Sequence, residues 1–215
     1  MATKVDQHGS VAVLTLGEDE NRFSPAWLDE VNARLDDIKG TSEGLVTVGT
    51  GKFYSNGLDL EWLSANAERG PWYVGAVQRL FARILTFPMP TVAAVNGHAF
   101  GAGAMLAIAH DYRLMRTDRG YFCFPEADIN IPFTAGMAAL IQSKVTPQTA
   151  VASMTTAHRF GGPDARAAGL VDDTASEQEL VGEAVDRIRP FVGKDPGTLG
   201  AVKSTMYASV IEALQ

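Results

Sequence analysis

The sequence has very little cysteine and no concentration of positive charge. Cys123 is the single cysteine among 215 residues, so one chain can build neither a disulfide framework nor a zinc site of cysteine ligands. Lys and Arg total 18 against 25 Asp and Glu, which gives a formal net charge of −7 and no basic block suited to a polyanion. We therefore expect a packed thiol at Cys123 and no nucleic-acid partner.

Long hydrophobic runs are also missing. The longest apolar stretch near the start, Val11 to Leu16, is far too short for a membrane span or a signal peptide, and no basic segment precedes it. This pattern predicts no membrane association and a cytoplasmic location. Hydrophobic residues still make up 46% of the chain, which is enough for one large domain with a sizeable core.

Short apolar runs alternate with segments of helical periodicity, which indicates an α/β domain. Ser24 and Pro25 suit the start of a helix, and Ser176 with Glu179 forms the capping-box pattern of another. The pattern predicts strands over residues 11–16, 44–48, 91–95, 112–115 and 121–124, and helices from 24 to about 38, over 71–85, 102–110 and 176–189, and from 199 to 214.

A glycine-rich segment, residues 96–104, follows one predicted strand and precedes a helix of small residues. The first amides of such a helix lack partners and are suited to a developing negative charge. Glycines at positions 97, 101 and 103 match neither the dinucleotide-binding spacing nor a phosphate loop. The same small residues could instead serve only to let the helix pack closely.

A second segment, residues 53–60, also follows a predicted strand. Its Gly57 can adopt the backbone geometry that would leave the amide of Leu58 free. Two turns of this kind could direct their amides at a single oxygen atom.

Together, residues 53–60 and 96–103 resemble the two signature segments of the crotonase (enoyl-CoA hydratase/isomerase) superfamily, and the resemblance covers nearly the whole chain. It implies an α/β spiral of repeated ββα units over residues 1–175. A short helical C-terminal segment, 176–215, would form the subunit contacts of a homotrimer or hexamer. The substrate would be an acyl-CoA, with no further cofactor and no metal.

The resemblance also implies roles for individual residues. The backbone amides of Leu58 and Ala102 would form the oxyanion hole. Lys203 would contact a CoA phosphate, either in its own chain or across a subunit boundary. The remaining residues that it places along the substrate and CoA are Phe23, Ser24, Ser55, Asn56, Gly57, Asp59, Gly101, Met105 and Phe133.

The acidic residues favour one reaction of this superfamily. Its hydratases carry two glutamates, but here Met105 stands in place of the first, while Glu126, in Phe124-Pro-Glu126, matches the second. Moving a double bond from C3 to C2 needs only one base to carry the proton. The apolar neighbours of Glu126 should raise its pKa, and residues 105–115 and 128–133 resemble those of Δ3,Δ2-enoyl-CoA isomerases.

Two other functions remain open at this point. One is a different crotonase reaction, such as hydration or thioester hydrolysis, with Asp128 assisting. The other is a non-catalytic acyl-CoA-binding subunit, suggested by Met105 and the short C-terminal segment.

His98 and His110 lack spaced ligand partners, so we expect ordinary hydrogen-bonded histidines, and Asp111 is expected to support the fold.

Overall fold

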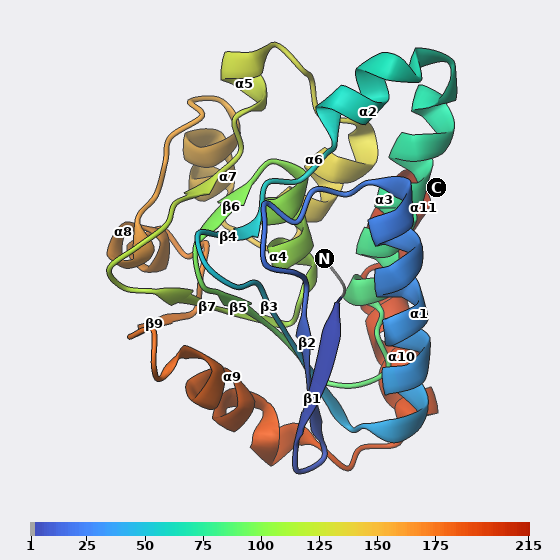
Figure 1. The fold of residues 1–215 in the computed structure, drawn as a ribbon, viewed down its shortest axis with the longest axis vertical. Coiled ribbons are helices and arrows are strands. Elements are labelled where there is room, and N and C mark those ends of the chain that lie inside the picture. The colour runs from blue at the N-terminus through green and yellow to red at the C-terminus, as the bar shows by residue number, and fades with distance from the viewer. Residues whose placement is uncertain (1–2) are drawn as a thin grey trace.

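The computed structural model describes residues 3–215 and contains one six-stranded sheet at its centre. The first pair of strands is antiparallel and every later pair is parallel. In spatial order the strands are β1 (Lys4–His8), β2 (Val11–Thr15), β3 (Gly44–Val48), β5 (Thr91–Val95), β7 (Tyr112–Arg116) and β9 (Asp173–Ala175) (Figure 1).

A smaller parallel sheet consists of β4 (Phe53–Ser55), β6 (His98–Phe100) and β8 (Phe122–Cys123). Each of its strands follows a strand of the large sheet and precedes a helix, so the chain repeats a strand–strand–helix unit three times. This arrangement confirms the expected spiral of ββα units. It also brings the segments after β4, β6 and β8 to the same edge of the molecule.

Helices cover both faces of the large sheet (Figure 1). The helices α1 (Pro25–Thr41), α3 (Gly70–Leu85) and α4 (Ala102–Ala109) pack on one face, and α9 (Leu180–Ile188) packs on the other. The remaining α-helices are α2 (Leu60–Ala65), α5 (Glu126–Ile129), α6 (Ala135–Gln142), α7 (Pro147–Met154), α8 (Gly162–Ala167), α10 (Pro196–Met206) and α11 (Ala208–Ala213).

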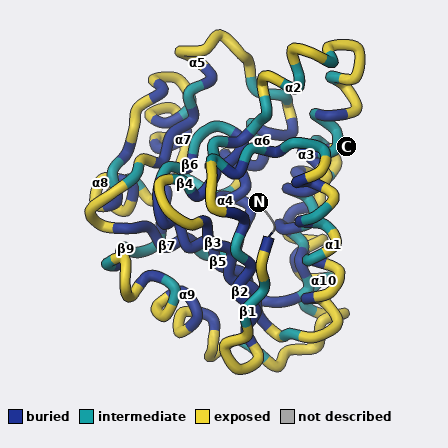
Figure 2. The backbone as a smooth tube through the Cα atoms, in the orientation of Figure 1, coloured by how far each residue is buried: buried dark blue, intermediate teal, exposed yellow. Residues whose placement is uncertain are grey.

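The start of α1 shows how the local sequence determines an element. The hydroxyl of Ser24 accepts a hydrogen bond from the Trp27 amide at 3.2 Å, and Pro25 occupies the first turn, where its missing N–H costs nothing. The buried residues of the helix are Trp27, Leu28, Val31, Leu35 and Ile38, as the periodicity predicts. Buried backbone is concentrated in the sheets and the inner helix surfaces (Figure 2).

The C-terminal segment differs from the prediction in two places. α9 begins at Leu180 and not near Ser176, because the Ser176 hydroxyl donates to the Glu179 carboxylate at 2.6 Å and does not cap an amide. The single helix expected over 199–214 is broken at Tyr207, whose backbone leaves the helical region with φ −111° and ψ 20°.

β1, which the sequence pattern did not predict, pairs with β2 at the sheet edge. No helix in residues 3–215 combines the length and apolarity that a membrane span requires.

Candidate active site

The two turns singled out in the sequence meet in the structure. Gly57 has φ +77°, a conformation that side chains disfavour. A methyl group added to it would lie 2.8 Å from the Ala102 nitrogen and 2.8 Å from the Phe100 carbonyl oxygen. The turn after β4 is therefore packed directly against the first residue of α4, and only glycine allows this approach.

The amides of Leu58 and Ala102 are available to a ligand. Neither donates a hydrogen bond to any other residue within 3–215. Ala102 is the first residue of α4, where helical geometry leaves the amide without an internal acceptor and the helix dipole adds a partial positive charge. Both amides belong to residues that line one cavity, which we call the Glu126 cavity.

Two buried groups fix the turn that carries the Leu58 amide. The Ser55 hydroxyl donates to the Asn21 carbonyl at 2.8 Å and accepts from the Gly57 amide at 3.0 Å. The Tyr73 hydroxyl accepts from the Asp59 amide at 2.9 Å, and burial raises the pKa of Tyr73 to about 12. Ser55 is thus fully buried and braces the turn, which corrects the expectation that it lines CoA.

Glu126 lies at the start of α5, directly after Pro125, and its side chain faces the glycine turn. A methyl group added to Gly101 would lie 3.3 Å from its Oε1 atom, while Oε2 has no hydrogen-bond partner among residues 3–215. The residue is only 9% exposed, and burial raises the pKa of its carboxyl to about 7. The expected rise of this pKa is confirmed, and the carboxyl is free to exchange a proton.

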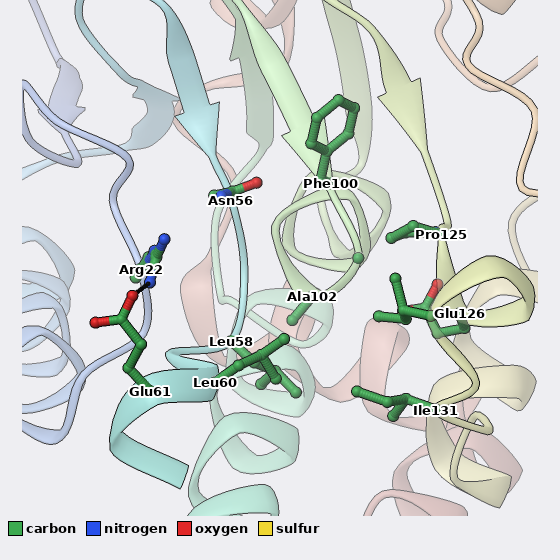
Figure 3. A pocket seen from close by; sticks show the side chains of 12 residues that line it. Arg22, Asn56, Leu58, Leu60, Glu61, Phe100, Ala102, Pro125, Glu126 and Ile131 are labelled. Atoms are coloured by element: carbon green, nitrogen blue, oxygen red, sulfur yellow. Dashed lines mark hydrogen bonds and ion pairs between the residues drawn. The ribbon is translucent and has the colours of Figure 1, made fainter. Parts of the chain in front are cut away.

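The Glu126 cavity has a volume of about 350 Å³ and is mostly apolar. Figure 3 shows Glu126 and Ile131 on one side, Leu58, Leu60 and Ala102 between, and Arg22 with Glu61 on the opposite side. The full lining is Arg22, Asn56, Leu58, Leu60, Glu61, Phe100, Gly101, Ala102, Pro125, Glu126, Ile129 and Ile131. Five expected site residues come together here: Leu58, Ala102, Glu126, Asn56 and Gly101.

Sequence reasoning missed the polar rim of this cavity. Arg22 forms ion pairs with Glu20 at 2.5 Å and with Glu61 at 3.1 Å, which connects the loop after β2 to α2. The Glu61 side chain is 87% exposed. The local sequence around Arg22 or Glu61 does not indicate that the two residues pair. The pair is apparent only in the tertiary structure, which brings the two segments together.

The structure places several expected substrate contacts in the core. Phe23 is fully buried and stacks on Trp27 with ring centroids 4.5 Å apart, and Met105 is 1% exposed within α4. Phe133 packs against Phe124 and is not part of the cavity lining. The burial of Phe23 and Met105 corrects the expectation that these two side chains line the substrate. Phe133 is only partly buried, and its contact with substrate remains a prediction.

Ser24 and Asp59 act as helix caps. The Asp59 carboxylate accepts from the Trp62 amide at 3.0 Å at the start of α2, as Ser24 does for α1. Both residues line a neighbouring cavity of about 640 Å³ beside the Glu126 cavity, and its wall includes Glu20, Glu30 and Arg22. The CoA contact expected of Ser24 and Asp59 remains a prediction, and it would involve this neighbouring cavity.

Lys203 lies far from this site, in α10. Its ammonium group is buried and donates to the Asp111 carboxylate at 2.6 Å and to the Met89 carbonyl at 2.8 Å. Asp111 also accepts from the Thr91 amide at 2.9 Å. The ion pair joins the C-terminal segment to the sheet and agrees with a structural role for Asp111. Within one chain Lys203 is therefore engaged away from the Glu126 cavity, and its contact with a CoA phosphate across a subunit boundary remains a prediction.

The other candidate groups lie outside the cavity. His110 is fully buried and hydrogen-bonds the Thr47 hydroxyl at 2.9 Å, and its pKa is lowered to about 3 by burial. Asp128 is exposed and does not line the cavity. Burial raises the pKa of Cys123 to about 11, so its thiol packs as expected. Residues 3–215 contain no cluster of three or more potential metal ligands.

Comparison with known proteins gives consistent matches in sequence. The sequence profile described as "Enoyl-CoA hydratase/isomerase" matches residues 6–215. Enoyl-CoA delta isomerase 3 of Arabidopsis thaliana is 37% identical over 182 residues, covering 80% of this chain and 76% of the relative. A putative enoyl-CoA hydratase of Thermus thermophilus is 30% identical over 213 residues, covering 94% of this chain and 82% of the relative.

The fold has counterparts among solved structures. The human mitochondrial delta3-delta2-enoyl-CoA isomerase superposes with a TM-score of 0.90 at 21% identity, covering 100% of this chain and 86% of that one. At this identity the likeness concerns the fold.

Proposed function

This chain belongs to the enoyl-CoA hydratase/isomerase family, and from that membership and the Glu126 cavity we propose that it is a Δ3,Δ2-enoyl-CoA isomerase. The observation that carries the proposal is one buried carboxyl group of raised pKa facing two free backbone amides. Three relatives from Arabidopsis thaliana, 32–37% identical to this chain, are named enoyl-CoA delta isomerases, and these names support the same reaction.

In the proposed reaction Glu126 carries the proton. Its carboxylate removes a proton from C2 of a 3-enoyl-CoA, and the electron pair shifts into the thioester carbonyl and the adjacent C–C bond to give a dienolate. The resulting carboxylic acid then returns the proton to C4, which leaves the double bond between C2 and C3. A pKa near 7 suits both half-reactions, because the group accepts and releases a proton at similar cost near neutral pH.

The amides of Leu58 and Ala102 stabilise the dienolate oxygen in this proposal. Both donors are held by the backbone before the substrate arrives, so they need no reorganisation as negative charge develops. Removing one donor of such a pair typically raises the barrier by about 3 kcal/mol. The contact between Gly57 and Ala102 fixes the spacing of the two turns and hence of the two amides.

The residues around Glu126 favour isomerisation over hydration. A hydratase needs groups that activate a water molecule and hold it over the double bond, a task that the superfamily's hydratases share between two glutamates. Met105, at the position of the first glutamate, is an apolar core residue here. The other carboxylate on the lining, Glu61, is exposed and engaged with Arg22 at the rim.

Exposed apolar side chains at the cavity mouth are suited to the acyl chain. Leu60, Ile129 and Ile131 are 41%, 45% and 37% exposed although they line a cavity whose floor holds Glu126. An acyl chain lying across them would bury apolar surface worth about 25 cal/mol per Å². The thioester would then lie between Glu126 and the two amides, with CoA extending past Asn56 towards the cavity that Ser24 and Asp59 line.

The test replaces Glu126 by Gln and assays purified protein on 3-enoyl-CoA and 2-enoyl-CoA side by side. We expect isomerase turnover to fall by about 10²- to 10⁴-fold, the usual contribution of a positioned general base. Asp128→Asn is the matched control, because this carboxylate lies two residues away but is exposed and outside the cavity, and its turnover should remain within about twofold of the unchanged protein.

Each alternative predicts a different result in the same assays. Unchanged isomerisation in Glu126→Gln would refute the proposed base. Efficient addition of water to 2-enoyl-CoA by the unchanged protein would identify a hydratase. Tight acyl-CoA binding with turnover of neither substrate would indicate a binding subunit.

A further inference from the structure

A second cavity, which we call the Lys144 cavity, lies at the opposite end of the sheet from Glu126. It has a volume of about 380 Å³ and shares no lining residue with the Glu126 cavity. Pro90 and Asp111, at the entrances to β5 and β7, form its floor, whereas the Glu126 cavity adjoins the far ends of these ββα units. Its outer wall belongs to α10, on the lower right of the molecule in Figure 1.

The wall of this cavity is largely apolar and partly exposed. Val202 and Met206 of α10 are 54% and 65% exposed, and Phe191 is 38% exposed. Leu199 and the ring of Tyr112, which stacks on Phe191 with centroids 6.1 Å apart, extend the apolar surface inward. These side chains form a surface that suits a hydrocarbon chain.

Lys144 provides a cation in this cavity that lacks an anionic partner. Its ammonium group donates to the neutral Tyr207 hydroxyl at 3.1 Å and lies over the Tyr207 ring at 5.0 Å. Within residues 3–215 no carboxylate oxygen lies within 4.0 Å of it. The neighbouring buried cations differ, since Lys203 pairs with Asp111 at 2.6 Å and Arg113 with Asp172 at 3.3 Å.

The lining of the cavity around Lys144 carries more positive than negative groups. The pKa of Lys144 is lowered to about 8, chiefly by burial and then by the charge of Arg113, with a smaller lowering by Lys203, while Asp111 and Asp172 oppose the shift. Lys194 adds another cation to the lining, so three lysines face a single carboxylate there. In a chain whose net charge is −7, this local excess of positive charge is suited to one added anion.

We propose that the Lys144 cavity is a binding site for an amphipathic monocarboxylate, a fatty acid whose carboxylate pairs with Lys144 while its chain lies against α10. The apolar wall favours a hydrocarbon tail over a phosphate ester or a nucleotide. Lys144, whose ammonium group has only the Tyr207 hydroxyl as a hydrogen-bond partner, can pair with the carboxylate. The site is independent of acyl-CoA chemistry, because it uses none of the residues that surround Glu126.

The test measures binding of decanoate, decanol and decylamine to the full chain by isothermal titration calorimetry. Decanoate should bind at least about tenfold more tightly than neutral decanol or cationic decylamine, because only the carboxylate can pair with the ammonium group of Lys144. Its affinity should fall as the pH rises from 7 to 10, since Lys144 loses its charge over that range.

Two variants assign the binding to this cavity. Lys144→Met removes the charge at similar length and should weaken decanoate binding at least about tenfold, whereas Lys39→Met, at an exposed lysine of α1, should leave it unchanged. Val202→Glu places a carboxylate on the exposed wall without disturbing the core, so it tests the site even if Lys144→Met unfolds. We expect it to weaken decanoate binding to a similar extent.

A further pair of measurements separates binding in the Lys144 cavity from binding in the catalytic site. If decanoate binds in the Lys144 cavity, Glu126→Gln should leave its affinity unchanged, and an acyl-CoA at saturation should not displace it. The proposal is overturned if decanoate does not bind, if it binds no better than decanol, or if Val202→Glu leaves its affinity unchanged. A change in the size of the assembly on Val202→Glu, without decanoate binding, would assign the cavity to a subunit contact and would equally overturn the proposal.

Discussion

At the scale of single residues, Glu126 has the property on which the proposed chemistry depends most. Its carboxyl lies in an apolar surrounding, and no side chain or backbone amide among residues 3–215 satisfies Oε2. Desolvation disfavours the charged form and moves the pKa of Glu126 from 4.5 to about 7. The same environment that makes the group a better proton carrier also makes its ionised form costly to the fold.

This pKa predicts the pH dependence of the reaction. The base is the carboxylate, so kcat/KM for 3-enoyl-CoA should rise about tenfold per pH unit below about 7 and level off above it. A pH–rate profile of the unchanged protein measures this directly. A profile that is flat between pH 5 and pH 8 would contradict the assignment of Glu126 as the base.

The pKa shift also predicts how stability changes with pH. Below pH 4.5 the carboxyl is neutral in both the folded and unfolded states; as the pH rises to about 7, the unfolded state ionises first and stability is lost. Full ionisation should cost on the order of 3 kcal/mol. Compared with the unchanged protein in urea unfolding, Glu126→Gln should therefore gain little free energy of unfolding at pH 4.5 and clearly more at pH 8. An equal gain at both pH values would contradict the raised pKa of Glu126.

At the scale of structural elements, the site depends on two strand-to-helix connections that approach within van der Waals distance. Gly57 and Gly103 both permit this approach, since a methyl group on Gly103 would lie 2.3 Å from the Ser55 carbonyl oxygen. Asn96 adds a further link by accepting a hydrogen bond from the Gly49 amide at 2.8 Å. The spacing of the two amides in the proposed oxyanion hole is thus a consequence of backbone packing more than of any side chain.

Gly57→Ala tests this dependence. The methyl group would meet the Ala102 nitrogen at 2.8 Å and would force a side chain into φ +77°, so the turn must shift and one amide donor should be lost. We expect kcat to fall about 10²- to 10³-fold, with destabilisation of about 1–3 kcal/mol. Turnover on 3-enoyl-CoA and urea unfolding measure the two effects.

Gly182→Ala is the matched control for this substitution. Gly182 lies inside α9, and a methyl group there would meet nothing within 4 Å. Alanine should stabilise the helix by up to about 1 kcal/mol and leave turnover unchanged. Equal turnover in the two alanine variants would exclude the proposed role of the Gly57 turn.

At the scale of the whole molecule, the C-terminal segment is fastened to the sheet by a buried ion pair. Lys203 donates to the Met89 carbonyl just before β5 and to the Asp111 carboxylate just before β7, and Gln78 of α3 donates to the Leu214 carbonyl at 3.4 Å. Gly136 of α6 allows the Ala213 carbonyl to approach, since an added methyl group would lie 2.4 Å from it. Residues 176–215 therefore pack on their own chain; their participation in a homotrimer or hexamer remains a prediction.

Lys203→Met tests whether this lysine is structural. Removing one partner leaves Asp111 with an uncompensated charge in a largely buried position, so the free energy of unfolding should fall by about 3–5 kcal/mol. The KM for an acyl-CoA should change by less than about twofold, because Lys203 lies outside the Glu126 cavity.

The double variant Asp111→Asn/Lys203→Met serves as its control. It removes both charges and should recover part of the lost stability, as a charge pair requires. A several-fold rise in KM without loss of stability would instead assign Lys203 to CoA recognition.

The sequence alone determined much of the local structure and favoured one kind of chemistry. Helix α1 begins and buries its residues as its capping serine and periodicity predict, and the glycines mark the two turns, because these features depend on neighbours within a few positions along the chain. The Pro-Glu pair within an apolar segment indicated Glu126, and Met105 in place of a glutamate favoured a one-base reaction.

Only the tertiary structure decided which residues face the cavity. Phe23, Ser55 and Met105 point into the core, Lys203 pairs with Asp111, and the rim pair of Arg22 and Glu61 forms between segments 39 positions apart. The direction of a side chain and the partner of a charge depend on how distant elements pack. The two amides likewise become one site only because Gly57 lets the turn after β4 rest against the start of α4.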